Sequence, residues 1–306
     1  MTRRCGFAAV IGAPNAGKST LTNRLVGAKV SIVTQKVQTT RFPVRGVALA
    51  GEAQIVLVDT PGIFQPRRRL DRAMVRSAWG GAEDADAVVH LVDAPAQLGD
   101  SPADRRAQAD VETIIAGLKA SGKSAILALN KVDAVKREAL LGVSAALFET
   151  GAYDEAFMIS ASTGSGVDDL KAKLAERMPE GEWLYPEDQT ADLPARLLAA
   201  EITREKLYLR VHEELPYSAA VETTAFQERK HGGVRIEQTI YVERESQRPI
   251  ILGKGGQTLK WIGQKSREDL SVILDRPVHL FLHVTVDERW ADKRAFYGDL
   301  GLDYDA

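Results

Sequence analysis

Short apolar runs alternate with amphipathic stretches through about the first 175 residues of the chain. Each run has four to six residues rich in Val, Ile, Leu and Ala, and the five runs are Phe7–Ile11, Ile55–Val58, Ala87–Val92, Ala125–Leu129 and Ala156–Ile159. Runs of this kind predict strands that are buried on both faces. The stretches between them, such as Asp110–Ala120 and Val167–Arg177, have helical periodicity. The alternation predicts an α/β unit with a mixed, mostly parallel sheet covered by helices.

The pattern changes after Met178, where prolines, a glycine and several acids predict a linker. A different order of elements follows it: a helix at Ala195–Val211, strands at Tyr217–Gln227 and Val234–Val242, helical pattern at Gln257–Leu274 and a strand at Val278–Val286. A turn at Lys230–Gly233 would join the first two strands. We therefore expect domains at residues 1–178 and 196–306, joined by a linker at 179–195, the second domain being a smaller α+β unit.

Composition adds mainly exclusions. The 306 residues carry 40 Lys+Arg against 42 Asp+Glu, a formal net charge of −2, and 44% are hydrophobic, which argues against disorder. Cys5 is the only cysteine, so no disulfide can form within the chain and no cysteine-based zinc site is available. The apolar runs are shorter than the ~20 residues that span a bilayer. Five histidines show no metal-ligand spacing, and we interpret them as structural or surface residues. A cytoplasmic protein is the expectation.

A glycine-rich loop follows the first strand, reads G-x-x-x-x-G-K-S from Gly12 to Ser19, and opens a helix. Such loops wrap backbone N–H groups around the β-phosphate of a nucleotide at a helix N-terminus. Lys18 would reach the β- and γ-phosphates, and the Ser19 hydroxyl would ligate Mg²⁺. The alternative is a tight turn with a surface lysine, which the agreement of eight positions disfavours. The predicted nucleotide contacts here are Gly12, Asn15, Ala16, Gly17, Lys18, Ser19 and Thr20.

Asp59-Thr60-Pro61-Gly62 follows the strand at Ile55–Val58. An aspartate at the carboxyl edge of a parallel sheet, beside a phosphate loop, would hold Mg²⁺ through a water. The Gly62 N–H would meet the γ-phosphate and so sense its presence.

The base is predicted by Asn130-Lys131-Val132-Asp133, directly after the strand at Ala125–Leu129. The Asp133 carboxylate can accept hydrogen bonds from the ring N–H and the exocyclic amine of guanine, a donor pair that adenine lacks. The aliphatic stem of Lys131 can cover the base. After the next strand, a backbone N–H near Ser160 and Ala161 can donate to guanine O6. A charged turn is the alternative, which the chain order of the elements disfavours.

These elements together resemble the translation-factor-like class of P-loop GTPases over about residues 6–175. The resemblance implies GTP hydrolysis with Lys18, Thr40, Asp59 and Gly62 in the catalytic machinery, and GTP or GDP with Mg²⁺ as ligands. In such proteins a threonine before the second strand caps Mg²⁺ in the GTP state. Thr39 and Thr40 are the candidates, and we favour Thr40 because it directly precedes Arg41.

The hydrolysis rate is expected to be slow without a partner. Many GTPases place a water-orienting glutamine just after D-x-x-G, whereas this chain has Ile63, which forms no side-chain hydrogen bond. The phosphate loop resembles those of GTPases that coordinate K⁺ through an asparagine, here Asn15. Asn15 as a simple loop cap is the alternative. Arginines 67–69 can supply a finger or form a solvated switch segment, and we favour the second interpretation.

A second glycine loop lies in the smaller domain, in Ile250–Leu259, which matches I-x-G-x-x-G-x-x-L. Residues 246–267 contain five basic residues and no acid, although the chain as a whole is near neutral. Such a loop lets an RNA phosphate approach closely while bases lie in an adjacent apolar groove. A helix–helix corner with solvated lysines is the alternative. The predicted RNA contacts are Ile251, Gly253, Lys254, Gly255, Gly256, Lys260 and Lys265.

The second domain resembles a type II KH domain. Nearly the whole chain resembles the Era family of bacterial GTPases. This wider resemblance is carried by residues 201–207 and 214–218, together with Gln38-Thr39-Thr40-Arg41 in the first domain. It implies binding of the single-stranded 3′ region of 16S ribosomal RNA and a role in maturation of the small (30S) ribosomal subunit. It also implies a monomer that does not bind DNA, with a fraction peripheral to the inner membrane. The loop here is Gly-Lys-Gly-Gly, where many relatives have Gly-Asn-Lys-Gly.

Three other functions fit the sequence less well. A regulatory RNA-binding protein with a merely structural nucleotide site is disfavoured by intact Lys18, Ser19 and Asp59. A tRNA-modification GTPase calls for a carrier domain or a catalytic C-terminal cysteine, and the one cysteine is Cys5. A membrane-signalling GTPase calls for a lipidation motif, which we do not find.

Overall fold

The structure is a computed structural model that describes residues 2–211, 215–229 and 232–306. Two compact units make up the chain: Met1–Asp192 together with Leu300–Ala306, and Leu193–Asp299. The division places residues 300–306, which we expected in the second domain, in the first unit. His212 and His231, which we interpreted as structural or surface residues, lie outside the described residues, as does Lys230 of the expected turn.

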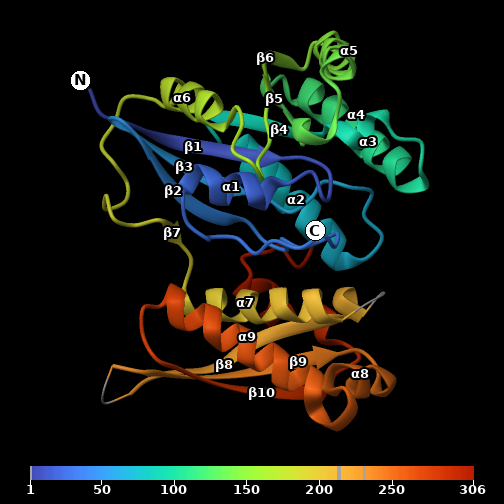
Figure 1. The fold of residues 1–306 in the computed structure, drawn as a ribbon, viewed down its shortest axis with the longest axis vertical. Helices are drawn as coiled ribbons and strands as arrows, with labels where there is room; N and C mark the ends of the chain where they lie inside the picture. Colours follow the sequence, from blue (N-terminus) through green and yellow to red (C-terminus); the bar gives the residue numbers. More distant parts are fainter. Residues whose placement is uncertain (1, 212–214, 230–231) are drawn as a thin grey trace. The chain divides into compact units, whose positions relative to one another are not determined.

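The first unit is built on a seven-stranded sheet in the order β6-β5-β4-β1-β3-β2-β7 (Figure 1). Strands β1, β3, β4, β5 and β6 run parallel, and β2 pairs antiparallel with both β3 and β7. The sheet is therefore mixed and mostly parallel, as predicted. Its strands are β1 (Arg4–Ile11), β2 (Val44–Ala50), β3 (Ala53–Asp59), β4 (Ala87–Asp93), β5 (Ala125–Asn130), β6 (Tyr153–Met158) and β7 (Ala191–Asp192).

Helices cover both faces of this sheet. Alternate residues of β1, Ala8 and Val10 against Ala9 and Ile11, belong to two separate hydrophobic cores. Helices α1 and α6 contribute to the first core, and α2, α4 and α5 contribute to the second. The helices are α1 (Lys18–Val26), α2 (Arg69–Glu83), α3 (Ala94–Leu98), α4 (Pro102–Ser121), α5 (Arg137–Phe148) and α6 (Val167–Arg177), with a short helix η1 (Val132–Ala134).

The chain between α6 and the second unit is fastened to the sheet. The Gln54 side chain on β3 accepts hydrogen bonds from the Leu184 and Tyr185 N–H groups at 2.9 and 3.0 Å, and donates to the Tyr185 carbonyl at 2.8 Å. Beyond this clamp, β7 pairs with Arg45 and Gly46 of β2. Cys5 is buried beside the clamp, with Sγ 3.5 Å from Gln54 Oε1.

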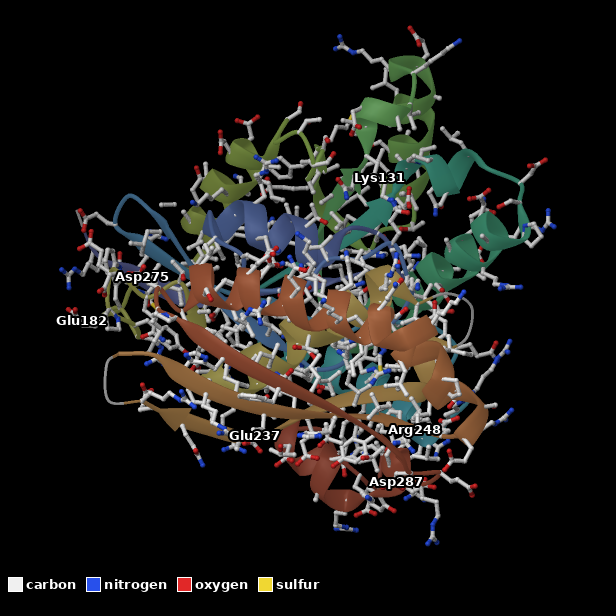
Figure 2. All side chains as sticks on the ribbon, turned by 60° about the horizontal axis from the view of Figure 1, so that its bottom comes forward. Lys131, Glu182, Glu237, Arg248, Asp275 and Asp287 are labelled. Carbon is white, nitrogen blue, oxygen red and sulfur yellow. The ribbon has the colours of Figure 1, made fainter. Side chains whose placement is uncertain are left out.

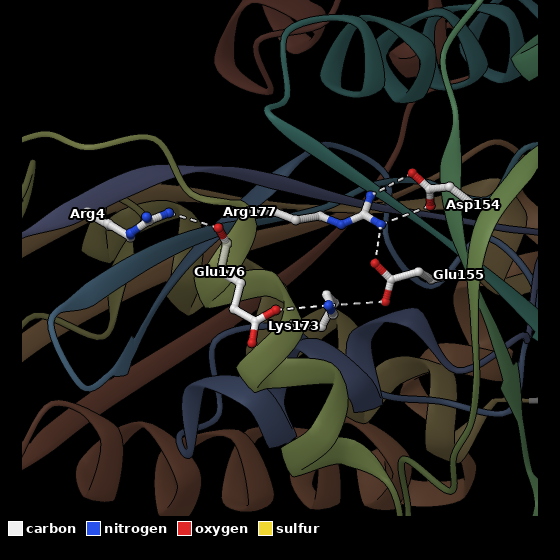
Figure 3. Close-up of polar contacts among 6 residues, drawn as sticks. All are labelled: Arg4, Asp154, Glu155, Lys173, Glu176 and Arg177. Carbon is white, nitrogen blue, oxygen red and sulfur yellow. Dashed lines mark hydrogen bonds and ion pairs between the residues drawn. The ribbon is translucent and has the colours of Figure 1, made fainter.

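A network of ion pairs holds α6 against the edge strand β6 (Figure 3). The Arg177 guanidinium donates to both carboxylate oxygens of Asp154, at 3.1 and 2.9 Å, and to Glu155 at 2.9 Å. Lys173 bridges Glu155 and Glu176 at 3.5 and 2.8 Å. Residues 159–166 join β6 to α6, and these pairs hold the two elements together at the end away from that connection.

The second unit packs helices on one face of a three-stranded sheet in the order β10-β9-β8 (Figure 1). Strand β9 pairs antiparallel with β8 and parallel with β10. One hydrophobic core joins the sheet to α7, α8 and α9. The elements are α7 (Ala195–Arg210), η2 (Leu215–Ser218), β8 (Ala219–Glu228), β9 (Val234–Val242), η3 (Glu245–Gln247), α8 (Arg248–Leu252), η4 (Lys254–Gly256), α9 (Gln257–Ile273), β10 (Val278–Val286), η5 (Trp290–Asp292) and α10 (Arg294–Asp299). Within the described part of the chain, no helix combines the length and apolar character needed to cross a membrane.

Candidate nucleotide and nucleic-acid sites

The phosphate loop joins β1 to α1, and its glycines are required by space as well as by conformation. Gly12 and Gly17 have φ of 157° and 100°. A Cβ on Gly12 would lie 2.4 Å from the Leu91 carbonyl oxygen, and one on Gly17 would lie 2.5 Å from Asn130 Nδ2. The loop can therefore pass between β4 and the Asn130 side chain only without side chains at these positions.

Lys18 is buried at the start of α1, and its ammonium donates to the carbonyls of Gly12 and Ala13 at 3.0 and 2.9 Å. Burial lowers the pKa of Lys18 to about 8, while the charges of Asp59 and Asp110 act in the opposite direction. The side chain therefore stays cationic at neutral pH and is held inside the loop, where phosphate oxygens would be bound.

Three oxygen-bearing side chains from separate segments meet beside the loop. Ser19 Oγ lies 2.8 Å from Thr40 Oγ1, which lies 3.4 Å from Asp59 Oδ2. Asp59 is fully buried, and its Oδ1 has no hydrogen-bond partner among the described residues. Burial raises the pKa of Asp59, and hydroxyls and Lys18 oppose that rise. Hard oxygen ligands with an unpaired buried carboxylate oxygen fit a Mg²⁺ ion. Elsewhere in the described ranges, no group of three or more His, Cys, Asp or Glu residues is arranged to hold a metal.

Asn130 at the end of β5 ties two loops of the site together. Its Nδ2 donates to the Ala16 carbonyl at 2.7 Å, and its Oδ1 accepts from the Ala161 N–H at 2.9 Å. Ser160 is buried, and its Oγ accepts from the Thr163 N–H at 3.2 Å. The Ala161 N–H is thus engaged by Asn130 in this structure, and its predicted bond to guanine O6 would share that donor.

Lys131, labelled in Figure 2, is held over the same site from two sides. Its Nζ pairs with Asp93 Oδ2 at 2.5 Å and donates to the Asn15 carbonyl at 2.9 Å. Asp133, in η1, is exposed, so its carboxylate is accessible to a base. The sequence analysis missed Asp93, although the rule that singled out Asp59 applies to it: Asp93 is the last residue of β4, at the carboxyl edge of the parallel sheet.

Backbone strain gathers at this site. Within the described ranges, four residues other than glycine have positive φ, and three of them, Asn15, Gln38 and Lys131, lie in the phosphate loop, the segment before Thr40 and the base-binding motif. Such conformations cost about 1–3 kcal/mol each and persist where the surroundings impose them. The three positions are therefore held by their contacts and favour a preorganised binding site.

The segment after Asp59 is linked to the segment before Thr40. Asp71 Oδ2 accepts hydrogen bonds from the N–H groups of Arg67 and Arg68 at 3.0 Å each, and its Oδ1 accepts from Gln38 Nε2 at 3.1 Å. Asp71 therefore caps α2 and joins it to the threonine-bearing loop. The sequence analysis missed this link, because nothing in the local pattern places Gln38 opposite Asp71.

Ile63 lies at the other end of the same segment, and Asp110, on α4, contacts that segment at Gln65. Ile63 is buried, and its N–H donates to the Gly12 carbonyl at 3.1 Å, so its side chain packs in the second core. Burial raises the pKa of Asp110 to about 6, against a hydrogen bond from the Gln65 backbone and the charge of Lys18. Asp110 on α4 thus lies close to Gln65.

The second glycine loop lies between α8 and α9. Gly253, Gly255 and Gly256 have φ of 70°, 61° and 77°. A Cβ on Gly253 would lie 2.3 Å from Thr258 Oγ1, whereas one on Gly255 or Gly256 would meet nothing within 4 Å. The backbone is therefore closely packed on its inner side and open on its outer side, where Lys254 is exposed.

Two of the predicted RNA contacts, Ile251 and Lys265, are already engaged within the protein. Ile251 is fully buried in the core of the second unit, and its neighbour Ile250 is 54% exposed. Lys265 is paired with Glu268 at 2.7 Å, just beyond the acid-free stretch that we counted. Lys254 and Lys260 are exposed, and Arg248 opens α8 (Figure 2). The basic surface around the loop is therefore carried mainly by Lys254, Lys260 and Arg248.

Together these features define a P-loop GTPase, joined here to a KH domain. They are a strand, the phosphate loop that follows it, the buried Asp59 and the motif Asn130-Lys131-Val132-Asp133. Residues 7–131 match the family described as 50S ribosome-binding GTPase, and residues 214–291 match the KH domain family.

The chain is 71% identical to GTPase Era of Caulobacter vibrioides (strain NA1000 / CB15N), over 99% of this chain and 97% of that protein. It is 59% identical to GTPase Era of Maricaulis maris (strain MCS10), over 99% of this chain and 98% of that protein. It therefore belongs to the Era family of GTPases, which hydrolyse GTP.

Two solved structures share the whole fold. An Aquifex aeolicus Era variant bound to GDP·AlF4⁻ is 38% identical, with a TM-score of 0.87 and coverage of 97% of this chain and 99% of that one. Era in complex with MgGDPNP and nucleotides 1506–1542 of 16S ribosomal RNA is also 38% identical, with a TM-score of 0.87 and coverage of 98% and 99%.

Proposed function

We propose that this GTPase binds GTP with Mg²⁺, holds single-stranded RNA from the 3′ region of 16S ribosomal RNA in its KH domain, and couples the two. The observation that carries the proposal is the meeting of Ser19, Thr40 and the buried Asp59 carboxylate beside Lys18. Bound there, Mg²⁺ would neutralise charge on the β- and γ-phosphates. Lys18 would bind the same phosphates, and the Gly62 N–H and Thr40 would respond to the γ-phosphate.

Removal of the Lys18 ammonium tests the part of the proposal that concerns GTP hydrolysis. Lys18→Ala removes the buried ammonium, so GTP hydrolysis should fall at least about a hundredfold, the scale of a lost electrostatic contact in an active site. The measurement is phosphate release under single-turnover conditions. The matched control is Lys123→Ala, since the Lys123 ammonium bonds carbonyls such as Ala82 in the same unit but outside the site. Unchanged turnover in Lys18→Ala would support a regulatory RNA-binding protein instead.

Slow intrinsic turnover follows from Ile63, whose buried side chain cannot orient water. We propose that Asn15 helps to hold K⁺ beside the phosphates, where an arginine finger otherwise acts. Its positive φ, 63°, and the use of its carbonyl by Lys131 keep the residue at the mouth of the loop. Hydrolysis in K⁺ should exceed hydrolysis in Na⁺, and Asn15→Ala should remove the difference. Equal rates of the unaltered protein in the two salts would refute the K⁺ proposal.

The RNA part rests on the second glycine loop. Gly255 and Gly256 are open on the outer side, where a phosphate can approach the backbone, and Lys254 and Lys260 supply exposed positive charge. We assign the apolar contact with bases to the exposed Ile250 in place of the buried Ile251. The complex of Era with nucleotides 1506–1542 of 16S ribosomal RNA supports this choice of ligand.

Gly255→Asp tests the RNA site. The change adds a carboxylate to the loop without a steric clash, because nothing lies within 4 Å of a Cβ there, but it places a side chain at a φ of 61°, so the control must have the same backbone conformation. Binding of a labelled oligonucleotide with the 16S 3′ sequence should weaken at least about tenfold, since one charge contact is replaced by repulsion. Gly51→Asp, at a glycine of the first unit with a similar φ, 58°, and nothing within 4 Å of a Cβ, is the matched control. Equal affinity of Gly255→Asp and the unaltered protein would exclude this loop as the RNA site.

The remaining parts of the proposal concern partners and place. We propose that the RNA is presented by a precursor of the 30S subunit, that RNA raises the hydrolysis rate, and that the protein acts in 16S rRNA processing as a cytoplasmic monomer without affinity for DNA. A peripheral fraction at the inner membrane is a prediction from the family resemblance. Crosslinking of bound RNA in cells, followed by sequencing, tests the partner: reads outside the 16S 3′ region would contradict it.

A further inference from the structure

An arginine face on α2 is occupied by residues 302–306. Arg69, Arg72 and Arg76 are spaced by three and four residues, so they share one side of the helix. The opposite side of α2 is buried and includes Leu70, Ala73 and Met74. The arginine face therefore points away from the core of the unit and is available to another segment.

Each arginine contacts a different part of residues 302–306. The Arg76 guanidinium pairs with Asp303 at 3.2 Å, the Arg69 guanidinium lies 4.4 Å from the centre of the Tyr304 ring, and Arg72 Nε donates to the Ala306 carbonyl at 3.2 Å. Leu302, at the start of the segment, is buried. An exposed ion pair alone contributes little, but an ion pair, a cation–π contact, a hydrogen bond and a buried leucine together define a docked segment.

The docking surface is joined to the loop that carries Thr40. Asp71, directly before Arg72, accepts the Gln38 amide at 3.1 Å and caps the start of α2. Thr40 itself lies 2.8 Å from Ser19 in this structure. The docked segment is thus seen together with the arrangement that the proposed function assigns to the GTP-bound state.

We propose that the arginine face of α2 is a nucleotide-dependent docking surface whose partner is residues 302–306 of the same chain. The segment docks when the Thr40 loop closes on the nucleotide, and it is released when the loop opens after hydrolysis. Residues 193–299 form the second unit and residues 300–306 belong to the first, so docking attaches the chain that leaves the second unit to α2. The nucleotide dependence rests on the proposed function.

Carboxypeptidase trimming of the full chain measures docking. The rate at which residues 303–306 are removed is followed by mass spectrometry with GDP and with GDPNP plus Mg²⁺, and the ratio of the two rates is the readout. Removal should be at least about fivefold slower with GDPNP, the lower end of usual coupling between sites. A ratio of one, in a protein shown by titration to bind GDPNP, overturns the proposal. Failure to bind GDPNP would instead count against the proposed function.

Charge reversal identifies the contact. Arg76→Asp should bring the ratio close to one, and combining it with Asp303→Arg should restore the ratio, because the pair is re-formed with its charges exchanged. Arg106→Asp, at an exposed arginine on α4, is the matched control and should keep the original ratio. The assignment to this surface is overturned if Arg76→Asp keeps the ratio of trimming rates of the unaltered protein, or if the double variant does not recover that ratio.

Discussion

His90 makes the GTPase unit sensitive to mild acid. The residue is fully buried on β4, a strand whose apolar residues are buried as well. Its Nδ1 lies 2.7 Å from the Tyr153 hydroxyl. Burial raises the pKa of the phenol, so the hydroxyl stays protonated and shares one hydrogen bond with the neutral imidazole. His90 Nε2 has no partner among the described residues. A second proton would therefore create a buried cation with no counter-charge.

The magnitude follows from the pKa of His90, which burial and, to a smaller extent, the charge of Lys18 lower from 6.5 to about 3. Below the unfolded value the unfolded chain binds the proton and the folded chain does not, so stability is lost as the pH falls from 6.5 towards the folded value. With these two values, the free energy of unfolding drops by about 2 kcal/mol between pH 7 and pH 5.

His90→Gln removes this titration and keeps a neutral hydrogen-bonding partner for Tyr153. We expect the loss of stability between about pH 7 and 5 to be smaller in the variant by that amount. Urea unfolding is followed by the reactivity of Cys5, the only cysteine, with an acid-tolerant pyridyl disulfide, since Cys5 is buried on β1, beside β4.

Tyr153→Phe is the matched control. It lowers stability at both pH values but keeps the buried imidazole, so the pH dependence should persist. The raised pKa of Asp110 acts in the opposite direction, and it is common to all three proteins. Equal losses of stability in the unaltered protein and in His90→Gln would refute the reasoning.

Three further changes test the site. Asp133→Asn should weaken GTP binding at least about a hundredfold and favour xanthosine triphosphate, measured by competition, because the amide donates where the carboxylate accepts. Gly17→Ala places a Cβ 2.5 Å from Asn130 Nδ2 and should cost about 1–3 kcal/mol of stability, measured by urea unfolding; an unchanged midpoint would contradict the packing. Asp110 has a raised pKa, so the folded state favours its protonated form, and stability is lost as the pH rises through about 6. Asp110→Asn should therefore raise the urea midpoint at neutral pH and leave it unchanged near pH 4, since the asparagine oxygen can still accept from Gln65; a lower midpoint at neutral pH would contradict this.

Local pattern was enough for most of the fold. Strands β1, β3, β4 and β5 are buried almost throughout and so appear as continuous apolar runs, whereas the parallel edge strand β6 is partly exposed. Strands β9 and β10 have the predicted bounds. Strand β2 was missed because Arg45 and Gly46 interrupt its apolar residues. Strand β7 has two residues, too few to form a pattern, and exists only because β2 offers an edge. The segment Trp290–Tyr304, with no clear pattern, forms two short helices, η5 and α10, followed by turns and irregular chain.

The residues of the candidate site likewise divide into those that a local motif predicts and those that it does not. Motifs of fixed spacing predicted Lys18, Ser19, Asp59 and Asn130, because phosphate and base recognition constrains neighbouring residues together. Contacts between distant segments left no such signal. The ion pair of Lys131 with Asp93 joins residues 38 positions apart, and the pair of Arg76 with Asp303 joins residues 227 positions apart. Burial of Ile251 in place of Ile250 depends on the register of α8 on its core, which the apolar run alone does not fix.

The return of residues 300–306 to the first unit has a consequence for synthesis. Translation delivers the chain from residue 1 onwards, so β1 to β7 and α1 to α6 emerge and can fold while residues 193–299 are still being made. The arginine face of α2 stays solvated until residues 302–306 have been made. A GTPase unit can thus bind nucleotide early in synthesis, but the surface of α2 is completed only after the RNA-binding unit has been translated. Translation order alone therefore restricts the docked state to chains in which both units have been made.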